Sequence, residues 1–362
     1  MKRFASIDIL RGIAILLMIQ IHFVENLSAR ESSSAWLYDL SSTLGTLSAP
    51  LFTFLLGLSL WIWMEREKIS DRSKQEFGKV VTRRGLFLFG FGLAFAVLIW
   101  LPNEVFDWDI LTLLGASTVI LYLFRKMSPK TLVGLAILVL IVSPPLRSFT
   151  GYISHWPVDE YVYRFMMQDV VLGFFLHGYF PLFPWVFFAL MGLAVGKYYF
   201  GDKASERLRG SGMPVIGLVL IGLAVLGASL KGYFPGNLKG FFSEISFYPA
   251  STTYLIGLLG IILLGLWILY RSLDDAQLPK QNAVLIFFSR YSRFSLTTYI
   301  VHHAVHIWPI LWLAALEDKR DPWWYYGDAV STPIAFGLAL LFIAAFYVVL
   351  IRFEKWPSTL TF

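Results

Sequence analysis

The chain has 362 residues, of which 57% are hydrophobic and only 15% are charged, and its formal charge is +6. A soluble domain has about a quarter of its residues charged, so this composition excludes an ordinary soluble protein. The positive charge does not indicate a nucleic-acid partner, because the basic residues stand in short segments between apolar runs. The chain has no cysteine, which excludes disulfides, thiolate catalysis and thiolate metal sites.

Apolar runs close to twenty residues long recur along the chain, which is the length that a helix needs to cross about 30 Å of hydrocarbon. Because backbone groups in lipid must be paired within their own segment, these runs predict helices. They lie at residues 5–25, 45–64, 85–101, 108–124, 131–149, 180–199, 213–230, 251–270, 294–316 and 330–351. The sequence therefore predicts an all-α polytopic membrane helical bundle of about ten transmembrane helices, formed as a single domain over residues 1–362. Residues 150–179 and 282–290 favour short helices on the membrane surface.

Lysine and arginine are divided unequally between the two sides of the membrane. The loops on one side, together with both termini, hold 22 of them, and the loops on the other side hold 7. Such an excess marks the cytoplasmic side, so we expect both termini in the cytoplasm and the protein in the cytoplasmic (inner or plasma) membrane. All six histidines lie in outer loops or in the middle and outer parts of the spans. The groups suited to proton transfer at neutral pH therefore lie toward the extracytoplasmic face.

The first span carries four ionisable residues, Asp8, Arg11, His22 and Glu25. At 100° per residue, Arg11 and His22 are only about 20° apart around the helix, and the two acidic residues lie within about 60° of Arg11. A charge in a span costs about 2.5–3.5 kcal/mol on insertion scales, so such a stripe usually faces the protein interior and marks a functional site. The structural alternative is an ion pair of Asp8 and Arg11 at the headgroups, with His22 at the outer end of the span.

The ninth span is unusually rich in histidine. Ser295, Tyr299, His302 and His306 fall within about 40° of one line along the helix, whereas His303 points about 100° away. The structural alternative to a catalytic group is a hydrogen-bonded network between helices. The i,i+4 spacing of His302 and His306 would suit a metal, but no further ligand motif accompanies it, so we expect no metal.

Two other segments carry candidate functional residues. Arg83 and Arg84 begin the third span, where guanidinium groups could bind the phosphates of a cytoplasmic donor. Anchoring of the span at the cytoplasmic face explains the same residues without a ligand. Pro181 and Pro184 open the sixth span and predict an extended start, which either lines a cavity or belongs to an aromatic belt at the membrane interface.

Several of these motifs together resemble a known family. Asp8-x-x-Arg11-Gly12, followed by His22, resembles the opening of the transmembrane acyltransferase superfamily, and within it the bacterial relatives of the heparan-α-glucosaminide N-acetyltransferase catalytic domain. Later motifs of that family are similar to residues 48–57, 180–196 and 295–305, and the last of these singles out His302. Two features differ: Thr112 stands where these relatives often have histidine, and the first outer loop lacks the histidine that is catalytic in the human-type enzyme.

The resemblance implies a membrane-bound acyltransferase. Its reaction would move an acyl group, expected to be acetyl, from cytoplasmic acyl-CoA (acetyl-CoA) to a hydroxyl or amine of an extracytoplasmic saccharide or glycolipid. Besides the donor and the acceptor, membrane lipids are the expected partners; no metal and no nucleic acid is expected, and the sequence leaves open whether the chain forms a homo-oligomer.

The same resemblance assigns roles to the candidate residues. His22 would act as general base or transient acyl carrier, Glu25 would orient it, and His302 would be a second base or an oxyanion donor. The residues expected to bind the CoA or to stabilise the inner cavity are Arg83, Arg84, Arg11 and Asp8. The main alternative is a non-enzymatic transporter of a small anion or a lipid-linked sugar, although the sequence has no second copy of the proline-rich segment. A structural membrane subunit would leave the histidine cluster unexplained.

Overall fold

The computed structural model describes residues 4–28, 35–67, 74–100, 104–156, 161–201, 204–230, 233, 245–276, 282–317 and 329–354. Apart from one isolated bridge between Ser28 and Val330, the regular elements in these ranges are helices. Nine helices in the described ranges are long and apolar enough to cross a membrane. The predicted all-α fold is therefore confirmed, and the chain is an integral membrane protein.

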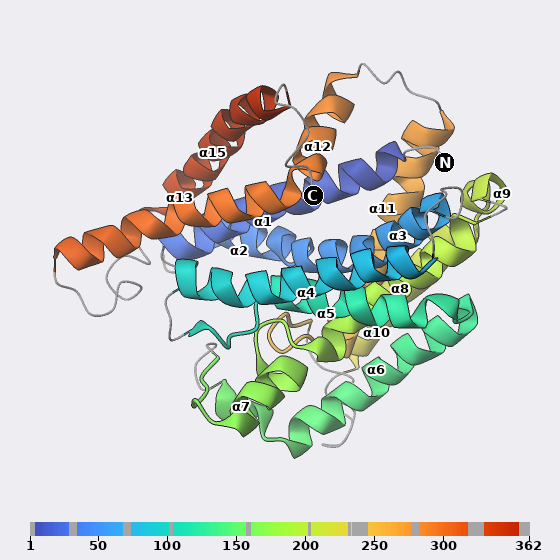
Figure 1. Ribbon diagram of the computed structural model, residues 1–362, viewed down its shortest axis with the longest axis horizontal. Coiled ribbons are helices and arrows are strands. Elements are labelled where there is room, and N and C mark those ends of the chain that lie inside the picture. The colour runs from blue at the N-terminus through green and yellow to red at the C-terminus, as the bar shows by residue number, and fades with distance from the viewer. Residues whose placement is uncertain are drawn as a thin grey trace. The chain divides into compact units, whose positions relative to one another are not determined.

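Figure 1 shows the helices in chain order. The helices are α1 (Ala5–Leu27), α2 (Ala35–Gly45), α3 (Ser48–Glu67), α4 (Lys74–Ile99), α5 (Ile110–Leu123), α6 (Pro129–Phe149), α7 (Met167–Leu172), α8 (Leu182–Tyr199), α9 (Ala204–Arg209), α10 (Gly212–Ser229), α11 (Thr252–Leu269), α12 (Ala283–Arg293), α13 (Ser295–Leu316) and α15 (Thr332–Phe353). Short 3-10 or π turns occur at Phe124–Lys126, Tyr152–His155, Gly173–His177 and Tyr270–Asp275.

Nine of the predicted spans coincide with the long helices, and the span predicted at residues 108–124 is the exception. Its helix, α5, has 14 residues. At 1.5 Å per residue this is about 21 Å, less than the thickness of the hydrocarbon. Asp109 is the N-cap of α5: its side chain accepts a hydrogen bond from the backbone N–H of Ile110, the first residue of the helix. The two predicted surface segments do contain helices, α7 in the first and α12 in the second.

The chain forms two compact units. Unit 1 comprises Phe52–Arg271, and unit 2 comprises Phe4–Leu51 and Ser272–Phe362. The chain passes from unit 2 to unit 1 within α3. That the two units act as one domain over residues 1–362 stays a prediction.

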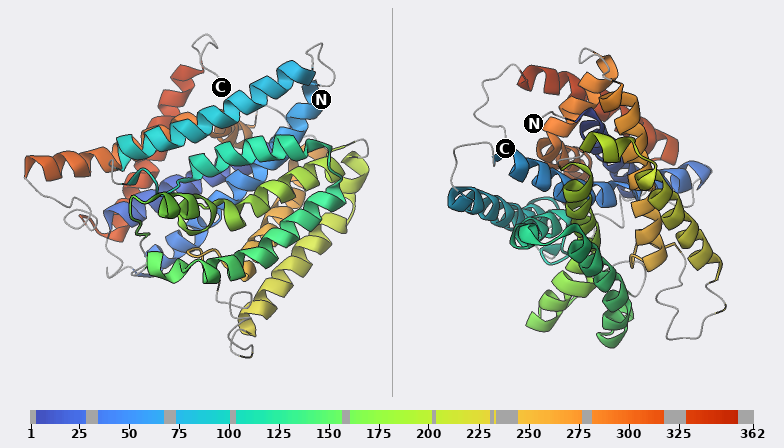
Figure 2. Two further views of the ribbon diagram at one scale, coloured as in Figure 1. Left: turned by 60° about the horizontal axis from the view of Figure 1, so that its bottom comes forward. Right: turned by 90° about the vertical axis from the view of Figure 1, so that its right-hand side faces the viewer.

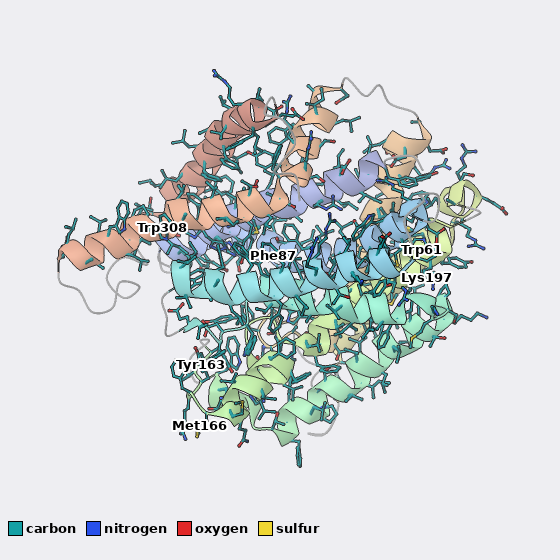
Figure 3. The ribbon with its side chains drawn as sticks, viewed as in Figure 1. Trp61, Phe87, Tyr163, Met166, Lys197 and Trp308 are labelled. Atoms are coloured by element: carbon teal, nitrogen blue, oxygen red, sulfur yellow. The ribbon has the colours of Figure 1, made fainter. Side chains whose placement is uncertain are left out.

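In unit 1, glycines allow α3 and α8 to pack closely. A Cβ atom on Gly57 would overlap the backbone of Ala189, and one on Gly192 would overlap the backbone of Phe54. Small residues at such crossings let two helix backbones approach in the membrane. At one end of this contact, the ammonium group of Lys197 lies 5.3 Å from the centre of the Trp61 ring (Figure 3). Elsewhere in unit 1, α4 packs along α5 and α10 along α11 (Figure 2).

The start of α8 is irregular, as its prolines predict. Pro181 precedes the first helical residue, and Phe183 has extended dihedral angles, φ −103° and ψ 120°. The peptide bond between Phe183 and Pro184 is cis. Trp185 is only 1% exposed and packs against Phe180. It therefore belongs to the core of unit 1, and the interpretation of this residue as part of an aromatic belt is not supported.

In unit 2, α1 is the central helix and contacts α2, α12, α13 and α15 (Figure 1). Its first turn is capped by a distant carboxylate: the two oxygens of Asp274 accept hydrogen bonds from the backbone N–H groups of Ala5 at 2.7 Å and Ser6 at 3.0 Å. A negative charge at this end also suits the helix dipole. At the other end, the backbone N–H of Val330 donates to the carbonyl of Leu27. Both ends of the helix that carries His22 are thus fixed.

Candidate active site

Helices α1 and α13 bring His22 and His302 into direct contact. The distance between Nδ1 of His22 and Nε2 of His302 is 2.9 Å. The two rings are nearly parallel, with 8° between their planes and 5.2 Å between their centres. His302 is buried, whereas His22 is partly exposed. The two histidines that the sequence selected therefore form one site.

The backbone determines which nitrogen of each ring carries the proton. Nδ1 of His302 lies 2.9 Å from the carbonyl oxygen of Thr298. A carbonyl oxygen can only accept, so in the neutral ring Nδ1 carries the proton and Nε2 has a lone pair. That lone pair must accept from Nδ1–H of His22. Nε2 of His22 then has a lone pair too, and no described residue donates a hydrogen bond to it.

A second pair of hydrogen bonds continues this network along α13. Nδ1–H of His306 donates to the carbonyl of His302 at 2.6 Å. Nε2 of His306 then accepts from the side-chain amide of Asn26, 3.1 Å away on α1. In both contacts α1 supplies the donor and α13 the acceptor, and these two hydrogen bonds, four residues apart on each helix, fix the register between α1 and α13 near His22.

His303 does not lie apart from the cluster, and this expectation from the helical angle is wrong. Its ring centre is 4.6 Å from that of His22 and 4.1 Å from that of His302, and the side chain is 1% exposed. Two successive residues of α13 thus both pack against His22. Each of His22, His302 and His303 offers one ring nitrogen, and these three nitrogens lie within 4.8 Å of one another. The three residues could therefore hold a metal ion.

Glu25 is not brought to His22. Its side chain is exposed, one turn beyond His22 on α1, and the contacts of His22 are with the histidines of α13. In this structure the hydrogen-bond partner of His22 is His302.

Asp8 and Arg11 form a separate polar cluster near the start of α1. The hydroxyl of Ser292, on α12, donates to Oδ1 of Asp8 at 3.0 Å and accepts from Nη1 of Arg11 at 2.9 Å. The same two charged groups are 3.7 Å apart. The hydrogen bonds with Ser292 direct both side chains toward α12. They lie about 16 Å or more along α1 from His22, at 1.5 Å per residue.

Arg83 and Arg84 differ in their surroundings, although both are exposed. Arg83 lines a shallow hollow of about 770 Å³, whose described lining residues all lie on α4: Gly78, Lys79, Thr82, Arg83, Leu86 and Phe87. Phe87 is labelled on this helix in Figure 3. The guanidinium of Arg84 instead lies 4.7 Å from the centre of the Trp63 ring. A ligand in the hollow would therefore meet Arg83 and not Arg84.

Sequence reasoning missed three residues that complete these clusters. Ser292 bridges Asp8 and Arg11, Thr298 fixes the His302 ring through its carbonyl, and Asn26 binds His306. Ser292 lies on α12, whose packing against α1 no local pattern reveals. Thr298 acts through its backbone, which the sequence cannot signal. Asn26 follows one turn after His22 on the same face and was the one residue that helical spacing could have found.

Comparison with known proteins identifies the family of the chain. The family model described as heparan-alpha-glucosaminide N-acetyltransferase, catalytic, matches residues 3–238, more than half of the chain. The chain belongs to this family. The resemblance drawn from the motifs of the first span is thereby confirmed. His302 lies outside the residues that the family model matches, so its part in the candidate site rests on the motif resemblance and on the geometry.

One curated relative is similar over a shorter stretch. The uncharacterized protein YxaH of Bacillus subtilis (strain 168) is 39% identical over 102 residues, which are 27% of this chain and 23% of that protein. The match thus spans less than a quarter of the relative's length, and the relative's name assigns no activity.

Proposed function

We propose that the chain is a membrane-bound acyltransferase that moves an acetyl group from cytoplasmic acetyl-CoA to a hydroxyl or amine of an extracytoplasmic saccharide or glycolipid. Membership of an N-acetyltransferase family supports the reaction class. The choice of donor and acceptor extends beyond that membership.

One observation carries the proposal: the hydrogen bond from His22 to His302 leaves Nε2 of His22 as an available base. A general base needs a lone pair, a fixed ring and a partner that stabilises the charged form. Nδ1–H of His22 has its acceptor at 2.9 Å, and that acceptor is itself held by the carbonyl of Thr298. The arrangement resembles the base and orienting residue of a catalytic triad, with a neutral imidazole in place of the carboxylate.

The proposed reaction proceeds in two balanced steps. Nε2 of His22 takes the proton of the acceptor's hydroxyl or amine while the acceptor's oxygen or nitrogen attacks the thioester carbonyl. The tetrahedral intermediate then collapses with cleavage of the carbon–sulfur bond, and the CoA thiolate leaves and takes up the proton from His22. His302 orients His22 and stabilises the imidazolium. Both nitrogens of His302 are engaged, so the proposal does not use it as an oxyanion donor.

Arg83 is the residue to which we assign the CoA phosphates. Beside it in the hollow, Lys79 adds a second cation, and Leu86 and Phe87 offer apolar surface to the pantetheine arm. Arg84 is stacked on Trp63, and Arg11 and Asp8 are bound to Ser292, so their proposed contribution to CoA binding is smaller.

The transporter alternative predicts a different product. A transporter would move its substrate unchanged, and no CoA would be consumed. Purified protein in proteoliposomes is given acetyl-CoA on one side and a panel of amino sugars and glycolipids on the other, and both acetylated product and free CoA are measured. We expect the two to appear in equal amounts. Passage of unmodified sugar without CoA release would refute the proposal and favour transport.

A further inference from the structure

The histidine cluster offers a metal ion three nitrogen ligands. One nitrogen each of His22, His302 and His303 lie within 4.8 Å of one another. Zn²⁺ binds imidazole nitrogen at about 2.0–2.1 Å, so two ligands of a tetrahedral site are about 3.4 Å apart. Nδ1 of His22 and Nε2 of His302 are already 2.9 Å apart. The nitrogen of His303 lies within 4.8 Å of the nitrogens of both other histidines, so the rings must turn toward a common centre to reach these separations.

His302 is already oriented as a metal ligand. Histidines that bind metals usually donate their other N–H to a backbone carbonyl or a carboxylate, which fixes the ring and directs the lone pair at the ion. Nδ1–H of His302 makes such a bond to the carbonyl of Thr298 at 2.9 Å. Its Nε2 lone pair points toward His22. The partly exposed side chain of His22 gives an ion access from outside the cluster.

The chemistry of the ligands selects the ion. Three neutral imidazoles suit Zn²⁺ and its neighbours in the first transition series, whereas Mg²⁺ and Ca²⁺ require oxygen ligands. Binding needs no loss of a proton from the protein: the hydrogen bond between His22 and His302 breaks, and the proton on Nδ1 of His22 moves to Nε2 of the same ring. A fourth position remains for water.

We propose that His22, His302 and His303 form a Zn²⁺ site, and that the bound ion inhibits the enzyme. Zn²⁺ at this site takes the lone pairs of His22 and His302, so that His22 can no longer accept the proton of the acceptor. The ion is thus an inhibitor and not a cofactor. The inhibition rests on the function proposed above, whereas the binding of Zn²⁺ does not.

His303 separates the two roles of the cluster. It is a ligand of the proposed metal site, but it is not a member of the hydrogen-bonded relay from His22 through His302 to Thr298. Substitution of His303 therefore removes one of three metal ligands and leaves the base and its orienting partner in place. His303→Phe keeps a ring against Tyr299, whose ring centre is 4.8 Å away, and serves as a second variant beside His303→Ala in case the smaller side chain destabilises the fold.

The test measures binding and inhibition separately on full-length protein stripped of metal with a chelator. Equilibrium dialysis against Zn²⁺ followed by metal analysis should give one ion per wild-type chain, and Mg²⁺ should give none. Even an outer-shell partner of a metal site contributes about 10–100-fold in affinity, so both His303 variants should weaken Zn²⁺ binding at least that much. The concentration of Zn²⁺ that halves acetyl transfer should rise in parallel.

Absence of Zn²⁺ binding by the wild type, or unchanged affinity in both His303 variants, would overturn the site. Binding of Zn²⁺ without loss of transfer would overturn the inhibition. If the wild type shows no transfer at all, the proposed function fails, while dialysis still decides whether the metal site exists.

Discussion

Replacement of His302 tests whether it acts by orienting His22. In the wild type, Nε2 of His302 accepts a hydrogen bond from Nδ1–H of His22, and the two nitrogens are 2.9 Å apart. His302→Leu removes this acceptor. Nδ1–H of His22 faces the fully buried position of His302, and a donor left unsatisfied there costs about 1–3 kcal/mol. At about 1.4 kcal/mol for each factor of ten in rate, kcat should fall about 5- to 150-fold. His302→Gln places an amide oxygen near the former position of Nε2, so it should recover most of that loss.

The assay is the release of CoA thiol at saturating acyl-CoA, with KM for acyl-CoA as a second readout. Neither substitution should change this KM, because His302 does not belong to the proposed CoA site. Val305→Ala is the matched control, since Val305 lies on the same helix with its side chain 47% exposed. Thermal unfolding of each variant shows whether the fold is retained. Equal losses for His302→Leu and His302→Gln in folded protein would refute an orienting role.

Three further outcomes are expected. Arg83→Ala should raise KM for acyl-CoA about 10- to 100-fold, which corresponds to the loss of a hydrogen bond to a charged group. Arg84→Ala should raise this KM less, because the guanidinium of Arg84 is stacked on Trp63. Equal effects of the two substitutions would contradict the assignment of the CoA phosphates to Arg83. Treatment with a chelator should leave acetyl transfer undiminished, and a loss that added Zn²⁺ restores would show that the reaction needs a metal. The chain has no cysteine, so single cysteines can be introduced at the positions of Glu206 and Glu317 and labelled with an impermeant reagent. The two should react from opposite sides of the membrane, the one at position 317 from outside. Labelling at position 206 from outside would reverse the expected orientation.

Most of the fold follows from the sequence because the membrane imposes a simple rule of length and hydrophobicity on each span. The rule fails at α5, whose apolar composition is typical of a span although the helix has only 14 residues. There the side chain of Asp109 binds the first N–H of the helix, and the 3-10 turn that starts at Phe124 ends it. Local hydrogen bonds of this kind depend on individual side-chain and backbone atoms, and the mean hydropathy of a sequence segment does not reveal them.

Part of the candidate site can also be predicted from the sequence. The helical period places His22 and Arg11 on one stripe of the first span and His302 and His306 on one line of the ninth, and the family resemblance singles out His302. The helical period could not place His303 in the cluster, because contact depends on how α13 crosses α1 and on the reach of the imidazole rings. The helical angle was also no guide to Glu25, which shares the stripe although its side chain is exposed.

The central claim is that Nε2 of His22 is the base in acyl transfer. The most direct measurement is the single-turnover rate of CoA release, with acetylated product counted beside it, for wild type and His22→Ala bound to the same acyl-CoA. Loss of a general base costs about 10²–10⁴-fold in rate, so His22→Ala should lose at least about 10²-fold while its affinity for acyl-CoA stays near that of the wild type. A folded His22→Ala protein that releases CoA and forms product at the wild-type rate would contradict the account.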